Sequence, residues 1–178
     1  MLAQFQSLKV FDLTCDPDLS SNHALFYLIE ALAGHVGLSN LVLGNVKIGR
    51  NECAALSAIL RNPASNLAAL FLNICRIDDY GARILSFGLK CNNTLRELFL
   101  RHNEAFTEIG WGSIFAVLES PNCRLEKLNL DLNRINDSLV RSLTNAICYN
   151  NTLKTLNLET ILSGGIVNDT TQLATIGW

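Results

Sequence analysis

The sequence has no apolar run long enough to cross a membrane, and it is poor in proline and aromatic residues. Proline occurs 3 times and aromatic residues make up 7% of the 178 residues, although 49% are hydrophobic. A membrane-spanning helix needs about 20 apolar residues, whereas the apolar stretch at residues 25–32 is short and contains Glu30. Residues 1–11 lack a basic start followed by an apolar core, so we expect neither a signal peptide nor a membrane partner.

The sequence also lacks a strong excess of charge of either sign. The net charge is −2 at pH 7, which gives no reason to expect nucleic acid or an acidic membrane surface as a partner. The length is that of one domain.

Motifs for catalysis, metals and cofactors are missing as well. Neither G-x-x-x-x-G-K-[ST] nor G-x-G-x-x-G occurs, so we expect no phosphate-binding or dinucleotide-binding loop. His23, His35 and His102 pair with no cysteine or carboxylate at metal-ligand spacing, and no Ser/His/Asp or Cys/His group can be identified. We therefore predict that the protein is not an enzyme and has no catalytic residue, no metal site and no cofactor.

The six cysteines include no C-x-x-C pair. They allow two interpretations, a disulfide framework in a secreted domain or reduced thiols inside a cell. The second is favoured because Cys75 occupies a position expected to be buried, and it predicts a cytoplasmic or nuclear protein. In a secreted protein, the sequons that begin at Asn92 and Asn150 would be glycosylation acceptors.

A leucine pattern recurs six times in the chain. Residues 125–135, LEKLNLDLNRI, fit L-x-x-L-x-L-x-x-N-x-I. The six copies start roughly 28 to 30 residues apart, at Leu8, Leu38, Leu67, Leu95, Leu125 and Leu153. The alternating leucines predict a short strand with one buried face, followed in each copy by a helix.

The ninth place of the repeat is occupied by Asn103 and Asn133 in two copies and by Cys75 in a third. An asparagine at this place can bond both to its own turn and to the neighbouring repeat, and a cysteine can replace it as a small buried group. The pattern therefore predicts a hydrogen-bonded ladder that runs from repeat to repeat.

The repeats resemble the ribonuclease-inhibitor-like class of leucine-rich repeats, in which a strand is paired with a full helix and two lengths alternate. The copies that begin at Leu67 and Leu125 are the shorter ones, and they end in the similar phrases CNNT and CYNNT. The resemblance implies an α/β solenoid shaped as a horseshoe, with parallel strands on the concave face and helices on the convex face. It also implies a scaffold like those in inhibitors, in NOD-like receptors and in GTPase regulators.

Residues 1–178 are accordingly predicted to form one solenoid of about six repeats. A single repeat cannot bury its apolar faces, so the repeats must stack. Neither end of the sequence has an obvious polar cap. We therefore expect a fragment of a longer array or an incompletely capped one, whose ends pack on further repeats or on a second copy.

Finer predictions concern the helices. Asp78 or Asp79 is expected to cap one helix and Asp137 another. The glycine at 110 repeats the one at 81, and we expect both to let a helix approach the strand layer closely. Trp111 is expected to be buried against a neighbouring helix.

The candidate binding site lies on the concave face. Side chains at the third, fifth and seventh places of each copy point away from the core. They place an apolar row beside two oppositely charged neighbours, Glu97 with Lys127 and Arg101 with Asp131. The predicted site residues are Val42, Phe71, Phe99, Glu97, Arg101, Lys127, Asn129 and Asp131.

These residues have two interpretations. An apolar patch with a charged rim is typical of a protein-binding site. Alternatively, Phe71 and Phe99 form only a cross-strand pair, and the charges form screened surface bridges. We predict a non-catalytic scaffold that binds a protein on this face. The alternatives are a GTPase-activating regulator resembling the Ran GTPase-activating protein, which would need an acidic tail or a dedicated catalytic surface, and a structural spacer in a larger protein.

Overall fold

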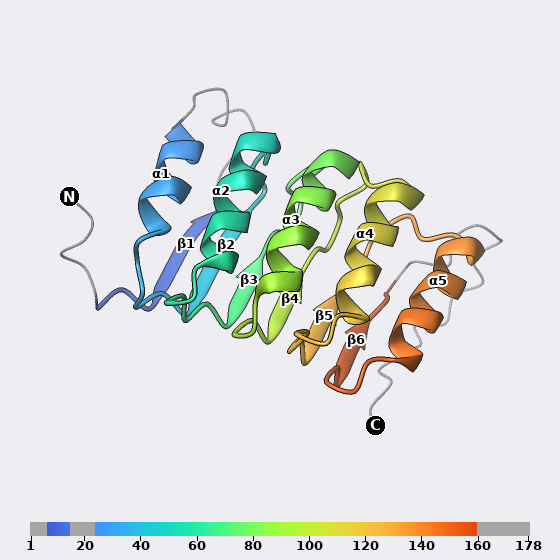
Figure 1. Cartoon of the computed structure of the whole chain (residues 1–178). Coiled ribbons are helices and arrows are strands. Elements are labelled where there is room, and N and C mark those ends of the chain that lie inside the picture. The colour runs from blue at the N-terminus through green and yellow to red at the C-terminus, as the bar shows by residue number, and fades with distance from the viewer. Residues whose placement is uncertain (1–6, 15–23, 160–178) are drawn as a thin grey trace.

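The computed structural model describes residues 7–14 and 24–159, in which strands and helices alternate (Figure 1). The strands are β1 (Val10–Thr14), β2 (Asn40–Gly44), β3 (Ala69–Phe71), β4 (Glu97–Phe99), β5 (Lys127–Asn129) and β6 (Thr155–Asn157). The helices are α1 (Ala24–Leu32), α2 (Arg50–Arg61), α3 (Asp79–Cys91), α4 (Glu108–Leu118) and α5 (Asp137–Cys148). No described helix is long and apolar enough to cross a membrane.

The strands form one parallel sheet, and each strand pairs with the next strand in the chain. The pairing places equivalent repeat positions opposite each other, and the fifth place forms a row of Asp12, Val42, Phe71, Phe99, Asn129 and Asn157. The register predicted from the leucine spacing is thus confirmed.

The described helices lie side by side along one face of the sheet and leave the other face uncovered by helices (Figure 1). Parallel strands are separated by about 4.8 Å, whereas packed helices need about 8–10 Å. The stack therefore curves with the strands inside and the helices outside. The predicted solenoid, with a concave strand face and a convex helix face, is confirmed.

The core lies between the two layers. Leu41, Leu70 and Leu128 of the strands have no exposed surface. Trp111 of α4 is also fully buried, and its ring centroid is 4.7 Å from that of Phe106 and 5.9 Å from that of its helix neighbour Phe115. Its burial was predicted, but these aromatic partners belong to its own repeat rather than to a neighbouring helix.

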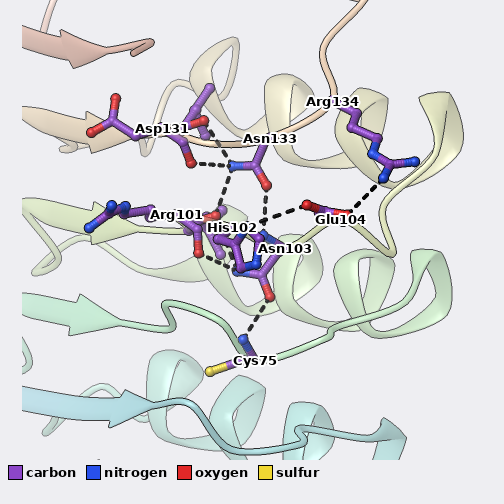
Figure 2. Close-up of polar contacts among 10 residues, drawn as sticks. Cys75, Arg101, His102, Asn103, Glu104, Asp131, Asn133 and Arg134 are labelled. Carbon is purple, nitrogen blue, oxygen red and sulfur yellow. Dashed lines mark hydrogen bonds and ion pairs between the residues drawn. The ribbon is translucent and has the colours of Figure 1, made fainter. Parts of the chain in front are cut away.

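The predicted asparagine ladder is present at the turns that leave the strands (Figure 2). The Nδ2 of Asn103 donates to the carbonyls of Leu72, at 2.7 Å, and Leu100, at 3.1 Å, and its Oδ1 accepts from the N–H of Cys75 at 3.1 Å. The Oδ1 of Asn133 accepts in turn from the N–H of Asn103 at 2.7 Å. Each asparagine therefore joins two repeats.

The helix caps partly differ from the prediction. Asp78 caps α3, because its Oδ1 accepts from the N–H of Gly81 at 2.8 Å. In α5 the cap is Asn136, whose Oδ1 accepts from the N–H of Leu139 at 3.0 Å. Asp137 is therefore not the cap. The capping residue needs extended backbone angles, and Asn136 has them, whereas Asp137 is the first residue of the helix.

The glycines at the starts of α3 and α4 both lie close to the preceding helix, and none of the atoms nearest to either glycine belongs to a strand. A Cβ added to Gly81 would lie 2.8 Å from the Cγ2 of Ile77, in the loop before α3, and 2.9 Å from the Sγ of Cys53 in α2. A Cβ added to Gly110 would lie 3.3 Å from the Cα of Asp79 in α3. The expectation of close contact with the strands was wrong, because these positions lie where neighbouring helices meet.

Asparagines in the repeated phrases CNNT and CYNNT clamp adjacent repeats together. The Nδ2 of Asn92 donates to the carbonyl of Leu60 at 2.8 Å, and its Oδ1 accepts from the N–H of Leu95 at 2.7 Å. Asn150 makes the equivalent bonds one pair of repeats later. Asn92 is 6% exposed, so its amide nitrogen is not accessible as a glycosylation acceptor in the folded chain.

Candidate protein-binding surface

The centre of the concave face is an aromatic stack. Phe71 of β3 and Phe99 of β4 are opposite each other in the sheet, with ring centroids 4.2 Å apart and ring planes 9° apart. Val42 of β2 continues the row beside Phe71. We call Val42, Phe71 and Phe99 the concave apolar row. All three side chains are partly exposed.

The sequence fixes the direction of these rings through the residues on either side. Phe71 stands between Leu70 and Leu72, and both leucines are fully buried. Successive side chains of a strand point to opposite faces. With the leucines in the core, the aromatic ring must therefore point to the concave side. The same alternation orients Phe99.

A lysine covers one end of the stack. The Nζ of Lys127 lies 5.1 Å from the ring centroid of Phe99, a cation–π contact. Glu97 is the register partner of Lys127 on the neighbouring strand, yet these two side chains form none of the ion pairs of the described residues. The ion pair between Glu97 and Lys127, which the sequence allowed, is therefore absent, and the ammonium group of Lys127 contacts the ring of Phe99 instead.

The second predicted pair is also not an ion pair. Asp131 is 8% exposed, and its carboxylate accepts from the Nδ2 of Asn129 at 2.8 Å and from the N–H of Glu159 at 2.7 Å. Arg101 is exposed on the adjacent turn, and Figure 2 shows both side chains on the strand side of the ladder without a contact between them.

The predicted site residues consequently fall into two groups. Asn129 and Asp131 are buried and bonded to each other, so they support the sheet. The partly or fully exposed members are Val42, Phe71, Glu97, Phe99, Arg101 and Lys127.

One structural role was missed in the sequence. The seventh-place side chain of two repeats holds the turn of the next repeat, because the Oδ1 of Asn73 accepts from the N–H of Arg101 at 3.0 Å, as Asp131 accepts from Glu159. The sequence did contain an indication of this role, because the seventh place of the third and fifth copies is a short polar residue, Asn73 or Asp131.

Two buried thiols, those of Cys53 and Cys75, are poor nucleophiles. Cys53, Cys75, Cys91, Cys123 and Cys148 are free. Burial raises the pKa of Cys75 to about 12, and burial, followed by the charge of Asp78, raises the pKa of Cys53 as well. Both remain protonated at neutral pH. Within residues 7–14 and 24–159, no three His, Cys, Asp or Glu side chains are placed to hold a metal ion.

The known proteins that are similar in sequence to this chain are leucine-rich repeat proteins. No protein-family model matches the chain. The chain is 30% identical to bovine NACHT, LRR and PYD domains-containing protein 5 over 131 residues, 74% of this chain and 12% of that protein. It is 31% identical to mouse ribonuclease inhibitor over 102 residues, 57% of this chain and 22% of the inhibitor. The repeats of this chain are leucine-rich repeats of the ribonuclease-inhibitor-like type.

Other similarities agree with this class. The leucine-rich repeats are 32% identical to mouse NACHT, LRR and PYD domains-containing protein 9B over 133 residues, 75% of this chain and 13% of that protein. The chain thus spans only a small part of the length of these relatives.

Solved structures also share the fold. The leiomodin-1 actin-binding site 2 has a TM-score of 0.64 and 20% identity, and the match covers 82% of each chain. The tropomodulin C-terminal domain of Caenorhabditis elegans has a TM-score of 0.64 and 14% identity, over 82% of this chain and 85% of that one. At these identities the likeness concerns the fold alone.

Proposed function

We propose that this leucine-rich repeat chain is a non-catalytic scaffold that binds a protein partner on its concave face. The observation that carries the proposal is the stack of Phe71 on Phe99 at the centre of an in-register parallel sheet. Aromatic side chains, phenylalanine among them, are enriched at protein interfaces, and their rigid rings lose little conformational entropy on binding.

The surroundings of the stack have the composition of an interface rim. Glu97, Arg101 and Lys127 are at least partly exposed next to the rings. An apolar centre with a polar edge is the usual arrangement of a specific protein interface. Because Lys127 and Arg101 are free of ion pairs with the described residues, a partner carboxylate can bind them without displacing an existing bridge.

The relatives support a binding role, and they supply defined probes. One is named for inhibiting ribonuclease, and one structural neighbour is named as an actin-binding site. A ribonuclease and actin are therefore the first two proteins to test. The free thiols support a reducing compartment, and we place the protein in the cytoplasm or the nucleus.

The test uses photo-crosslinking from the concave face. A photoreactive phenylalanine analogue at position 71 is irradiated in extract, with ribonuclease and with actin, and the crosslinked proteins are identified by mass spectrometry. We expect one protein to be captured repeatedly, and its affinity for the Phe71→Ser/Phe99→Ser variant to fall about tenfold or more, as for the loss of an aromatic hot spot.

The matched control is Tyr149, which is 81% exposed at the end of α5 and lies outside the concave apolar row. Tyr149→Ser should bind the captured protein with unchanged affinity. Equal binding by the parent chain and by a folded Phe71→Ser/Phe99→Ser variant would refute the concave site.

A further inference from the structure

Two large apolar side chains are exposed on the convex face. Phe87 of α3 is 57% exposed and Ile109 of α4 is 64% exposed. The positions equivalent to Phe87 in α2, α4 and α5 are Ala58, Ala116 and Asn145. The fold of a repeat therefore does not require an aromatic ring at this place.

These side chains border two neighbouring grooves between helices. The groove between α3 and α4 has a volume of about 480 Å³, and its lining includes Phe87, Ile109, Gly112 and Ala116. The groove between α2 and α3, of about 410 Å³, shares the wall formed by Phe87. A Cβ added at Gly112 would have no atom within 4 Å, so the floor of the first groove is open at this point.

The grooves are also lined by basic side chains. Arg61 and Arg83 line the groove between α2 and α3, and Arg83 and Lys90 line the one between α3 and α4. None of the three takes part in an ion pair of the described residues. The guanidinium of Arg61 instead lies 5.2 Å from the ring centroid of Phe87.

Of the carboxylates near the starts of α3 and α4, Glu108 lines the groove between these helices, whereas Asp79 lines neither groove. Asp79 binds the start of α4 through the N–H and the hydroxyl of Thr107, at 2.8 and 2.6 Å. Glu108 accepts from the Nδ2 of Asn136 at 3.0 Å. The three basic side chains outnumber Glu108, the single acidic residue of the two linings, so this surface has an excess of positive charge on a chain whose net charge is −2.

We propose that this surface binds an acidic protein segment that carries apolar side chains. The convex patch consists of Arg61, Arg83, Phe87, Lys90, Ile109 and Gly112. An apolar side chain of the segment lies over Gly112 between Phe87 and Ile109. The carboxylates of the segment bind Arg83 and Lys90, which stand one helical turn before and after Phe87 on α3, and Arg61 of α2. Charge complementarity selects the acidic partner, and the exposed apolar surface favours a protein over a nucleic acid.

The test uses fluorescein-labelled peptides of about 16 residues, in which Leu recurs every three or four positions and Glu fills most other places. Anisotropy measures their affinity for the full chain. We expect the acidic peptide to bind, and matched peptides with Gln for Glu or Ser for Leu to bind about tenfold more weakly. We expect Arg83→Glu and Gly112→Glu to weaken binding of the acidic peptide to a similar extent.

Matched variants separate the patch from general effects. Arg141 of α5 stands at the helical position equivalent to Arg83, so Arg141→Glu makes the same charge change outside the patch and should leave binding intact. Phe87→Ala introduces the residue found at this place in α2 and α4, and it should weaken binding without unfolding the chain.

Several outcomes would overturn the proposal. One is the absence of peptide binding to the parent chain, and another is equal binding by Arg83→Glu and Arg141→Glu. A third is a single-stranded DNA oligonucleotide that binds the patch more tightly than the peptide does. The Phe71→Ser/Phe99→Ser variant should bind the peptide normally, so failure of the concave site and failure of the convex patch are distinguishable.

Discussion

At the scale of the residue, His35 stands out because its ring is buried without a hydrogen bond. It is 8% exposed, and neither ring nitrogen has a partner among the described residues. His35, Asn92 and Asn150 each follow a helix, and each backbone N–H donates to a carbonyl three residues earlier, at 2.9, 3.1 and 2.9 Å. The two asparagines then use their side-chain oxygens to bind the following loop, which the imidazole does not do.

We therefore expect His35→Asn to stabilise the protein. The new Oδ1 would accept from the N–H groups of Gly37 and Leu38, and a buried unpaired ring would be removed. Net gains of about 1 kcal/mol per hydrogen bond are typical, so the free energy of unfolding should rise by about 1–2 kcal/mol. Urea unfolding followed by circular dichroism measures the change.

His35→Ala is the control for this substitution. It removes the ring but supplies no acceptor, and it should be less stable than His35→Asn. If His35→Asn were the less stable of the two, the asparagine clamp would not be transferable to this repeat.

At the scale of the element, the spacing of α2 and α3 depends on Gly88. A Cβ added there would lie 2.8 Å from the Cα of Ser57 and 3.1 Å from its carbonyl oxygen. Backbone atoms of a packed helix cannot move aside as the end of a side chain can. The two helices are therefore in contact through their backbones, and this contact sets the position of the groove above them.

Two glycine-to-alanine substitutions should consequently have opposite effects. Alanine favours a helix over glycine by about 1 kcal/mol, and Gly112→Ala should stabilise by about 0.5–1 kcal/mol because its surroundings are open. Gly88→Ala should destabilise by about 1–3 kcal/mol, because overpacking outweighs the propensity. Thermal unfolding of both variants measures the difference, and stabilisation by Gly88→Ala would show that α3 moves freely on α2.

At the scale of the whole molecule, repetition makes the architecture predictable. The order of strands, their register and the separate helix layer follow from the spacing of leucines such as Leu70, Leu98 and Leu128, because an alternating pattern has only one burial solution in a stack. The position of Phe71 beside Phe99 was predictable for the same reason.

The choice of side-chain partners was less predictable. Lys127 contacts Phe99 rather than Glu97, and Asp131 bonds backbone and amide groups rather than Arg101. Sequence spacing brings such groups within reach, but rotamers and competing donors decide which contact forms. The convex patch was missed because it combines residues from three helices whose relative spacing depends on contacts such as that of Gly88 with Ser57.

Two buried thiols in the middle of the stack should make the free energy of unfolding of the whole molecule fall at alkaline pH. An unfolded thiol loses its proton near pH 9.0, whereas the pKa of folded Cys75 is about 12, and burial raises the pKa of Cys53 too. Above about pH 9 the unfolded chain therefore releases protons that the folded chain retains. The contribution of these protonated thiols to the free energy of unfolding is complete below this pH. It declines as pH rises towards 12, by up to about 1.4 kcal/mol per pH unit for each thiol.

The test compares this decline between variants in urea unfolding with a reducing agent present, between pH 8.5 and about 10.5, a range that brackets the unfolded thiol pKa. Cys75→Asn introduces the residue found at Asn103 and Asn133 in the ladder, and it should remove one thiol's share of the slope while the repeats remain stacked. Cys53→Ala/Cys75→Asn should flatten the profile further. An identical slope in the parent chain and both variants would mean that water reaches these thiols in the folded stack.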